Sequence, residues 1–187
     1  MDSYSSFQSK RIFLRAFEKD DLPALHEYLN HAEIIGRRYI PWEISDVLPL
    51  STSDIEKVIA KWAEGEKQAN LAIIERTQGE LIGHACFSWS WDPHCPDLSL
   101  VIAPKYQRKG YGSETLKLIL DYLFQNTLAH NVSGWIADWN MPARQFVQKH
   151  GFKEVGTIRR DGIRNGKYYN LIQVDILKPE WKAKQER

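Results

Sequence analysis

The residues that most clearly could do chemistry lie in a short basic segment, 107–112, which reads Gln-Arg-Lys-Gly-Tyr-Gly. An apolar stretch precedes it and a helical pattern follows it. A helix that begins at such a loop directs several backbone N–H groups and its positive end at one point, which suits a phosphate or diphosphate. Gly110 and Gly112 let the main chain approach the anion closely, and Arg108 and Lys109 add positive charge. The segment predicts a site for a phosphorylated cofactor.

The composition favours one ordinary folded domain. The chain has 187 residues, of which 43% are hydrophobic and 26% are charged, so a substantial core is expected. A formal net charge of +1 gives no general attraction to nucleic acid or to an anionic membrane. No apolar run approaches the ~20 residues needed to cross a bilayer. Two cysteines and the absence of a leader-like start predict a reducing, cytoplasmic location.

Alternating strand and helix patterns position the basic segment. Apolar alternation and turn residues predict about seven strands, and helical periodicity predicts about four helices, which together indicate a layered α/β fold. The expected strands are 11–16, 70–75, 81–89, 97–102, 132–139, 152–159 and 167–177. The expected helices begin near residues 20, 53, 111 and 140.

Local signals set several boundaries of these elements. Ser53 and Glu56 have the spacing of a capping box, which predicts the start of the second helix. Asn140 is a suitable N-cap for the last predicted helix, and Gly151 a suitable left-handed end for it. Residues 161–166 predict the turn between the last two strands.

Three blocks of the sequence, in the right order, resemble the GCN5-related N-acetyltransferases. The segment 107–112 is similar to the family's acyl-CoA loop, and 140–152 is similar to its second motif. The stretch 164–177 looks like the closing hairpin of the ribosomal-protein and spermidine acetyltransferase branches. The resemblance covers 10–178, which implies a single domain between a flexible arm, 1–9, and a C-terminal tail, 179–187.

The resemblance implies the acyl-CoA N-acyltransferase fold, a mixed α+β arrangement with a mostly antiparallel sheet. It also implies that strands 97–102 and 132–139 splay apart and hold the pantetheine arm of acetyl-CoA, which pairs with the free backbone of one strand. For Arg144, a solvated helix residue is the open alternative. The residues that the resemblance assigns to acetyl-CoA are Leu100, Val101, Ile102, Gln107, Arg108, Lys109, Gly110, Tyr111, Gly112, Ser113, Asn140 and Arg144.

The resemblance also implies how the reaction proceeds. A backbone N–H near Leu100 or Val101 would stabilise the oxyanion. Asp97 stands where relatives often carry a Glu that accepts the amine's proton, and its shorter side chain favours a relay through water. A solvent-facing carboxylate at a strand start is the alternative for Asp97. Val147 and Ala143 replace the Tyr and Ser that many relatives use as a general acid, so that role has no obvious residue.

A second group of residues could hold a metal or act as a base. His84, Cys86, His94 and Cys95 offer nitrogen and sulfur ligands, but their spacing fits no common zinc motif, so no metal site is expected. His84 could serve as a catalytic base or be an ordinary hydrogen-bonded strand histidine.

Taken together, the sequence predicts an enzyme that transfers acetyl from acetyl-CoA to a primary amine in a ternary complex. A protein or peptide N-terminal amine ranks first as the acceptor, and a polyamine or other small amine ranks next. A non-catalytic acyl-CoA sensor or partner module is the alternative. A homodimer is possible, and neither nucleic acid nor a membrane is an expected partner.

Overall fold

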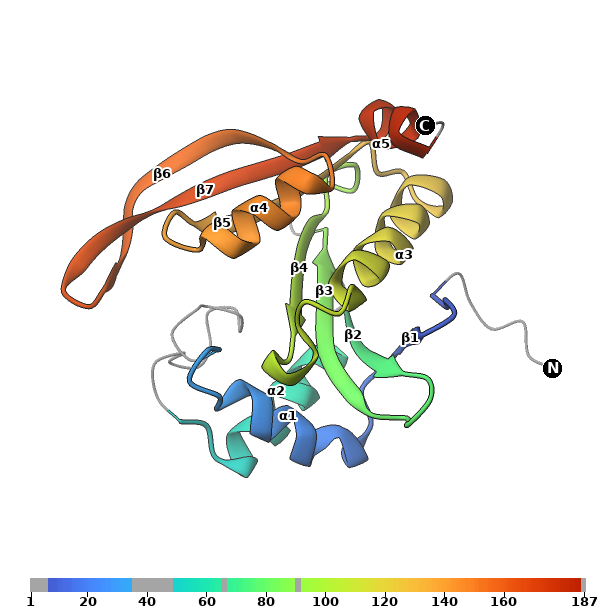
Figure 1. Cartoon of the computed structure of the whole chain (residues 1–187), viewed down its shortest axis with the longest axis vertical. Helices are drawn as coiled ribbons and strands as arrows, with labels where there is room; N and C mark the ends of the chain where they lie inside the picture. Colours follow the sequence, from blue (N-terminus) through green and yellow to red (C-terminus); the bar gives the residue numbers. More distant parts are fainter. Residues whose placement is uncertain (1–6, 35–48, 65–66, 90–91, 186–187) are drawn as a thin grey trace.

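The computed structural model describes residues 7–34, 49–64, 67–89 and 92–185. Its seven strands form one sheet in the order β1-β2-β3-β4-β5-β7-β6, as the sequence predicted in number and class (Figure 1). The strands are β1 (Ile12–Arg15), β2 (Gln68–Glu75), β3 (Leu81–Ser88), β4 (Asp97–Ile102), β5 (Asn131–Ala137), β6 (Lys153–Arg164) and β7 (Lys167–Leu177). The helices are α1 (Leu22–Leu29), α2 (Thr52–Glu64), α3 (Tyr111–Asn126), α4 (Met141–Lys149) and α5 (Lys178–Gln185), with short 3-10 turns at Lys19–Asp21 and Pro104–Tyr106.

The sheet is antiparallel except where β4 meets β5. These two strands run in the same direction but pair only at Asp97 and Ser133, near their N-terminal ends. Beyond that pair they separate, because β5 continues with β7 and β6 while β4 stays with β3 (Figure 1). The predicted splay is therefore confirmed. We call the unpaired stretch that follows Asp97 and Ser133 the split.

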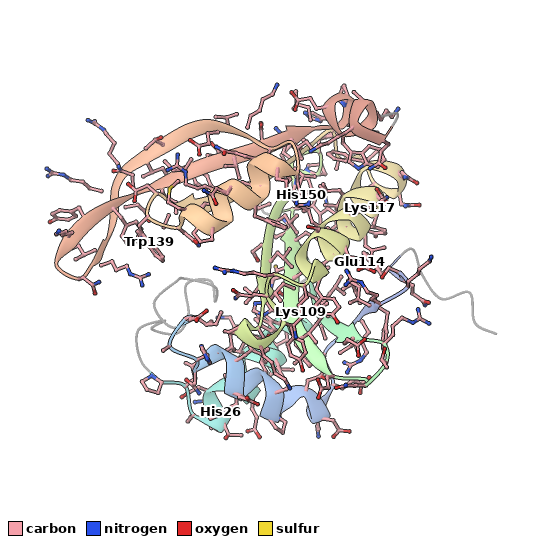
Figure 2. The ribbon with its side chains drawn as sticks, viewed as in Figure 1. His26, Lys109, Glu114, Lys117, Trp139 and His150 are labelled. Atoms are coloured by element: carbon pink, nitrogen blue, oxygen red, sulfur yellow. The ribbon has the colours of Figure 1, made fainter. Side chains whose placement is uncertain are left out.

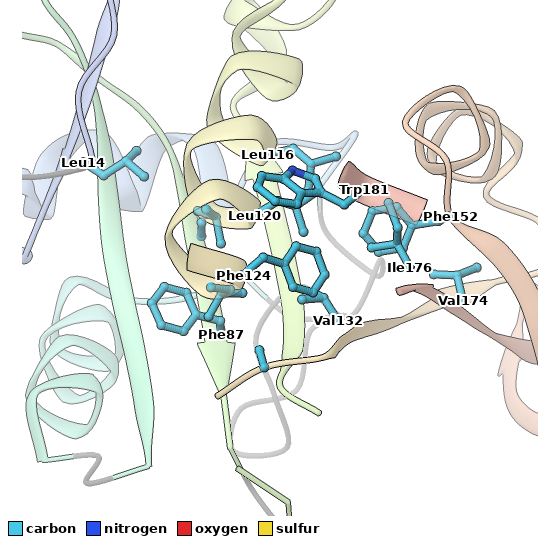
Figure 3. Packing of buried hydrophobic residues seen from close by; sticks show 14 of the residues in the cluster. Leu14, Phe87, Leu116, Leu120, Phe124, Val132, Phe152, Val174, Ile176 and Trp181 are labelled. Atoms are coloured by element: carbon cyan, nitrogen blue, oxygen red, sulfur yellow. The ribbon is translucent and has the colours of Figure 1, made fainter. Parts of the chain in front are cut away.

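Side chains alternate between two faces of the sheet and form two cores. On one face, α3 and α5 cover a cluster to which β7 contributes Ile172, Val174 and Ile176 (Figure 3). On the opposite face, α1 and α2 cover a cluster that includes Val101 of β4. We call these the α3 face and the α1–α2 face. Because alternation fixes which residues share a face, it also fixes which side chains can meet at the split.

The second helix begins two residues earlier than the sequence predicted. Ser51 and Asp54 form the capping box: the Asp54 N–H donates to Ser51 Oγ at 3.2 Å, and the Ser51 N–H donates to Asp54 Oδ2 at 3.0 Å. The assignment of this role to Ser53 and Glu56 was wrong. Both pairs have the same spacing, and the helix starts at the first one because Thr52 is already helical.

β7 has the predicted bounds, but β6 is longer and the turn between the two strands is tighter than predicted. β6 reaches Arg164, and the turn consists of Asn165 and Gly166, whose φ angles of 49° and 73° are both left-handed. This is the two-residue geometry that matches strand twist. The segment 161–166 is therefore not a turn as a whole. An irregularity in the pairing between Ile158 and Gly162 takes up the residues that read as turn formers.

Both ends of the chain contribute to the core. Of the predicted arm, 1–9, residues 7–9 are described, and the ring of Phe7 packs on Tyr122 with centroids 4.7 Å apart. The predicted tail contains α5, whose Trp181 is 7% exposed and packs on Phe124. The described residues thus form five α-helices where about four were expected. Within those residues, no helix combines the length and apolarity that crossing a bilayer requires.

Candidate functional site

The start of α3 presents unused backbone donors. The first hydrogen bond of this helix runs from the Glu114 N–H to the Gly110 carbonyl at 3.1 Å. The N–H groups of Tyr111, Gly112 and Ser113 come before it, so the helix offers them no acceptor. Together with the positive end of the helix dipole, these three donors form a site for an anion. The predicted phosphate cradle is present as a geometry.

The loop before α3 has the backbone conformation that this cradle needs. Arg108 and Gly110 have left-handed φ angles of 59° and 87°. The Gln107 side chain turns back and donates from Nε2 to the Ile102 carbonyl at 2.9 Å, which ties the loop to the end of β4. Arg108 and Lys109 are exposed, and the Lys109 ammonium lies 5.5 Å from the Tyr106 ring centre. The two positive charges therefore stand beside the donors and remain accessible to solvent.

Arg11 holds this loop in place, although nothing in the sequence pointed to it. Its guanidinium donates to the Lys109 carbonyl at 2.9 Å and to Glu114 Oε2 at 2.8 Å, and it lies 4.8 Å from the centre of the Tyr111 ring. Ser9 also donates to Glu114. Glu114 and Lys109 mark this start of α3 in Figure 2. Arg11 is about a hundred positions away in sequence, so only the folded chain reveals the contact.

The Glu114 carboxylate in this cluster is held in its charged form. Burial alone raises the pKa of Glu114, but the hydrogen bonds from Ser9 and Arg11 and the charge of Arg11 together lower it below its usual value. An ionised Glu114 close to an anion site would repel the ligand. The Arg11 guanidinium offsets that repulsion and also fixes the backbone of the loop.

The backbone of β4 exposes alternate residues to the split. The Ala103 N–H donates to the Ile82 carbonyl of β3, and the antiparallel ladder repeats every two residues. Val101 therefore bonds to β3, which makes it unsuitable as the oxyanion donor that the sequence allowed. Leu100 and Ile102 direct their backbone groups toward the split. Of the two predicted donors, Leu100 is the one with the right direction.

Asp97 lies at the closed end of the split. Ser133 Oγ donates a hydrogen bond to the Asp97 carboxylate, and the two residues form the only pair between β4 and β5 in the described chain. Asp97 is half-buried on the α1–α2 face, and Ser99 next to it on that face is exposed. Asp97 is three residues from Leu100, roughly 10 Å along an extended strand. A proton relay from Asp97 would therefore need water.

The helix α4 borders the split on the side of β5. Asn140 caps it through a hydrogen bond from the Ala143 N–H to Asn140 Oδ1 at 3.4 Å, as predicted. Phe146 points toward α3: a Cβ atom placed on Gly112 would lie 3.5 Å from its ring and 3.6 Å from the Ile102 side chain. The split is thus flanked on the α3 face by Gly112, Ile102 and Phe146.

Arg144 forms an ion pair that the sequence did not predict, and its role toward the cofactor stays a prediction. Its guanidinium forms a two-pronged ion pair with Glu154 of β6, with N–O distances of 2.8 and 3.0 Å. The hydrogen bonds that Arg144 donates to Glu154 raise the pKa of Arg144. This pair fastens α4 to the sheet.

The general acid that the family resemblance left unassigned is not supplied by a nearby phenol. Val147, at the expected tyrosine position, packs partly into the α3-face core. The Tyr106 hydroxyl donates to Glu80, the Tyr111 ring lies against Arg11, and the Tyr168 ring lies 5.2 Å from Arg160. The Tyr106 hydroxyl is therefore committed to Glu80, whereas the contacts of Tyr111 and Tyr168 involve their rings.

The histidine and cysteine residues do not form a site. His84 is 2% exposed, and its Nδ1 lies 2.8 Å from the Tyr28 hydroxyl, as expected of a hydrogen-bonded strand histidine. Burial raises the pKa of the Cys86 thiol to about 11, which makes it a poor nucleophile at neutral pH. In the part of the chain that the structure describes, no three His, Cys, Asp or Glu side chains come together as a metal site.

Comparison with known proteins gives a consistent result. A family model described as an acetyltransferase (GNAT) domain matches residues 11–153. The uncharacterized N-acetyltransferase YnaD of Bacillus subtilis is 27% identical over 92% of this chain and 97% of its own length. The spermidine N(1)-acetyltransferase of Vibrio cholerae is 24% identical over 95% of this chain and 99% of its own. The solved structure of spermidine N-acetyltransferase from Vibrio cholerae in complex with CoA and spermine superposes with a TM-score of 0.77, at 23% identity, over 93% of this chain and 99% of that one.

Replacing Gly112 by Ala should separate ligand binding from folding. The new Cβ lies at ordinary contact distance from Phe146 and Ile102, so the free energy of unfolding should change by less than about 1 kcal/mol. The methyl group occupies the approach to the helix N–H groups, so the affinity for coenzyme A should fall at least ~10-fold, which is ~1.4 kcal/mol. Calorimetric titration and urea unfolding measure the two effects.

The matched variant Gly110→Ala should, in contrast, lower the free energy of unfolding. At a φ of 87° a Cβ is strained, and it would lie 3.1 Å from the Arg11 guanidinium, so this variant should lose about 1–2 kcal/mol of stability. Unchanged coenzyme A affinity in Gly112→Ala would contradict the assignment of the cradle.

Removing the Arg11 guanidinium should loosen the loop in a pH-dependent way. Arg11→Met should cost about 1 kcal/mol of unfolding free energy at pH 7. Because the pKa of Glu114 is lowered on folding, the stabilisation is present above the carboxyl's unfolded pKa and is lost as the pH falls through its folded value. The difference between wild type and variant should therefore shrink in acid, to what the Lys109 carbonyl and the Tyr111 ring contribute. Lys117→Met, which removes an exposed pair with Asp121 on the same helix, is the control and should cost less than about 0.5 kcal/mol. A constant difference at all pH values would mean that Arg11 acts through packing alone.

Proposed function

Since the chain belongs to the GNAT acetyltransferase family, we propose that it transfers the acetyl group of acetyl-CoA to a primary amine by direct attack in a ternary complex. The observation that carries this proposal is the position of the donor cradle. The N–H groups of Tyr111, Gly112 and Ser113 stand at the end of β4 next to the split, where the backbone of Leu100 and Ile102 is released from pairing. One anionic and one extended, amide-containing part of a single ligand would fit these two features.

The residues fit coenzyme A in chemical terms. The three helix donors, with Arg108 and Lys109 beside them, suit its diphosphate. The free edge of β4 at Leu100 and Ile102 suits the two amides of the pantetheine arm, which would add to the sheet as a short extra strand. Asn140 at the start of α4 stands on the other side of the split and is the remaining polar group that we assign to the cofactor.

The chain's own groups then act on the reaction as follows. The Leu100 N–H donates to the carbonyl oxygen as it gains negative charge, and one such donor is worth roughly 3 kcal/mol. Asp97 receives the proton of the attacking amine through water on the α1–α2 face. The C–S bond breaks as the C–N bond forms, and the sulfur leaves as a thiolate or takes a proton from solvent. Because a thiol of pKa ~8.5 is already a good leaving group, the apolar Val147 does not prevent turnover.

For the acceptor, the ranking made from the sequence and the names of the relatives disagree. The names of the relatives give no support to the peptide amine that ranked first on sequence, and they favour a polyamine. They also give no support to a non-catalytic acyl-CoA binder, since each of them is named as an acetyltransferase. The ribosomal-protein branch, the homodimer and the cytoplasmic location stay predictions.

The direct test combines binding with turnover. Saturating coenzyme A at about a hundredfold excess over its Kd should stabilise the protein by about 2.7 kcal/mol, or roughly 5–10 °C in Tm. Acetyl-CoA with a panel of primary amines should release free thiol in step with product formation. Stabilisation without turnover of any amine would instead support a binder, and absence of both would reject the proposal.

Replacing Asp97 by Asn should test its role in proton transfer. If the carboxylate relays the proton, kcat/KM at pH 7.5 should fall about 100-fold while coenzyme A affinity is kept. The pH dependence of kcat/KM should also differ between the variant and wild type. Ser133→Ala removes the hydrogen bond to Asp97 but keeps the carboxylate, so kcat/KM should fall less than about 3-fold. If Asp97→Asn and Ser133→Ala lowered Tm equally and Asp97→Asn kept the wild-type pH profile of kcat/KM, the role of Asp97 would be to hold β4 and β5 together.

A further inference from the structure

Arg164 near the end of β6 is a cation without an anionic partner among the described residues. Its guanidinium carbon lies 3.8 Å from the centre of the Trp139 ring. Its Nη1 atom is buried and has no hydrogen-bond acceptor. A buried N–H of a charged group without an acceptor is costly, so its presence calls for an explanation.

Strand pairing places Arg164 on the α1–α2 face of the sheet. Alternation along β7 sends Ile172 and Val174 to the α3 face, and therefore Tyr169 to the opposite face. Residues that pair across two strands lie on the same face, and so do residues two apart on one strand. Arg164 pairs with Lys167, which is two residues before Tyr169, so Arg164 shares the face of Tyr169. The rings of Trp139 and Tyr169 meet edge to face at 6.2 Å. Arg164, Trp139 and Tyr169 thus form one group, which we call the aromatic–arginine group.

The aromatic–arginine group stands at the open end of the split. Trp139 follows the last residue of β5 by two positions, and the pairing of Asp97 with Ser133 puts Trp139 level with Ala103 of β4. Leu100 is three residues back along the strand, roughly 10 Å away in that direction. Figure 2 shows Trp139 beneath the β6–β7 hairpin, away from Lys109 and the start of α3.

The two faces of the sheet therefore serve two different ligands. The donor cradle, Gly112 and Phe146 belong to the α3 face, so the cofactor enters there. The α1–α2 face is left for the acceptor, and Ser99 of β4 is exposed on it. An acceptor whose amine reaches the level of Leu100 from this face extends along the split toward Arg164.

The charge around Arg164 is positive. The hairpin segment 159–168 carries four basic side chains and one acidic one, and its tip projects from the body of the protein (Figure 1). The carboxylate of Asp138, close in sequence to Trp139, accepts a hydrogen bond from the Asn170 N–H at 3.0 Å and is used in that way. A polycation such as a polyamine would meet repulsion here, whereas an anion would be attracted.

We propose that the acceptor is a primary amine that also carries a carboxylate, and that Arg164 binds this carboxylate. The inference rests on the proposed acetyltransferase function and names the substrate class of that site. The guanidinium, held flat against Trp139, presents its N–H groups as a fork, which matches the two oxygens of a carboxylate. Because Nη1 is buried, the carboxylate binds the other N–H groups of the guanidinium. Along the strand direction, roughly 10 Å separate Leu100 from the level of Trp139, whose ring Arg164 contacts, so the amine and the carboxylate stand at opposite ends of the acceptor.

The test uses acceptors that differ only in one charge. The pair 6-aminohexanoate and 6-aminohexanamide, and the C-terminally amidated tripeptides Ala-Ala-Glu and Ala-Ala-Gln, are compared with spermidine by thiol release from acetyl-CoA. Wild type should have a kcat/KM at least 10-fold higher for the carboxylate member of a pair than for its amide. Spermidine should be a poorer acceptor than either carboxylate.

Variants then assign the preference to Arg164. Arg164→Met keeps an apolar contact with Trp139 but removes the charge, and it should reduce the preference to less than 2-fold, mainly through KM. Arg164→Lys keeps the charge but not the forked geometry of the guanidinium. Its preference for the carboxylate acceptor should lie between those of wild type and Arg164→Met. Arg159→Met removes one charge from the same hairpin without touching Trp139, and it should keep the preference. Coenzyme A-dependent stabilisation should be equal in all four proteins.

The outcomes separate this inference from the proposed function. Turnover without a carboxylate preference, a best rate with spermidine, or a preference that survives in Arg164→Met would overturn the role of Arg164 and leave the acetyltransferase proposal standing. Absence of turnover with every amine would overturn both.

Discussion

The arrangement of this protein depends on one constraint, the single point at which β4 and β5 pair. Asp97 and Ser133 join the strands at one end, and beyond them each strand follows a different half of the sheet. β4 is held by β3, while β5 is held by β7. The separation leaves backbone donors and acceptors of Leu100 and Ile102 without a neighbouring strand. An unpaired edge of that kind is a template for an extended ligand.

The second half of the site follows from where the chain goes when β4 ends. The loop leads directly into α3, so the donors at the start of that helix stand at the end of the open edge. Arg11, reaching from the edge strand β1, fixes the loop and offsets the charge of Glu114. On the opposite face, the sheet around Trp139 and Arg164 is free of helices in the described residues. The two faces of the sheet at the split thus carry different side chains.

What the sequence could predict was what local patterns encode. β4, the glycine loop, the Asn140 cap and the end of its helix at Gly151 depend on residues close together in the chain, and they were predicted correctly. The start of α2 was misplaced because two serine-acid pairs have the same spacing. Contacts between distant residues had no sequence signal. Arg11 in the loop, Arg144 with Glu154, and Arg164 over Trp139 all depend on tertiary structure. The choice of Leu100 over Val101 required the register of the ladder, which only the fold determines.

The central claim is that one ligand occupies both the helix donors and the open edge of β4. Amide resonances report this directly, in a titration of isotope-labelled protein with coenzyme A followed by NMR. The claim predicts that the amide signals of Tyr111, Gly112, Ser113 and Leu100 shift together with one Kd, while that of Val101, bonded to β3, shifts much less. Shifts confined to the loop, or a Val101 signal that moves as far as that of Leu100, would contradict it.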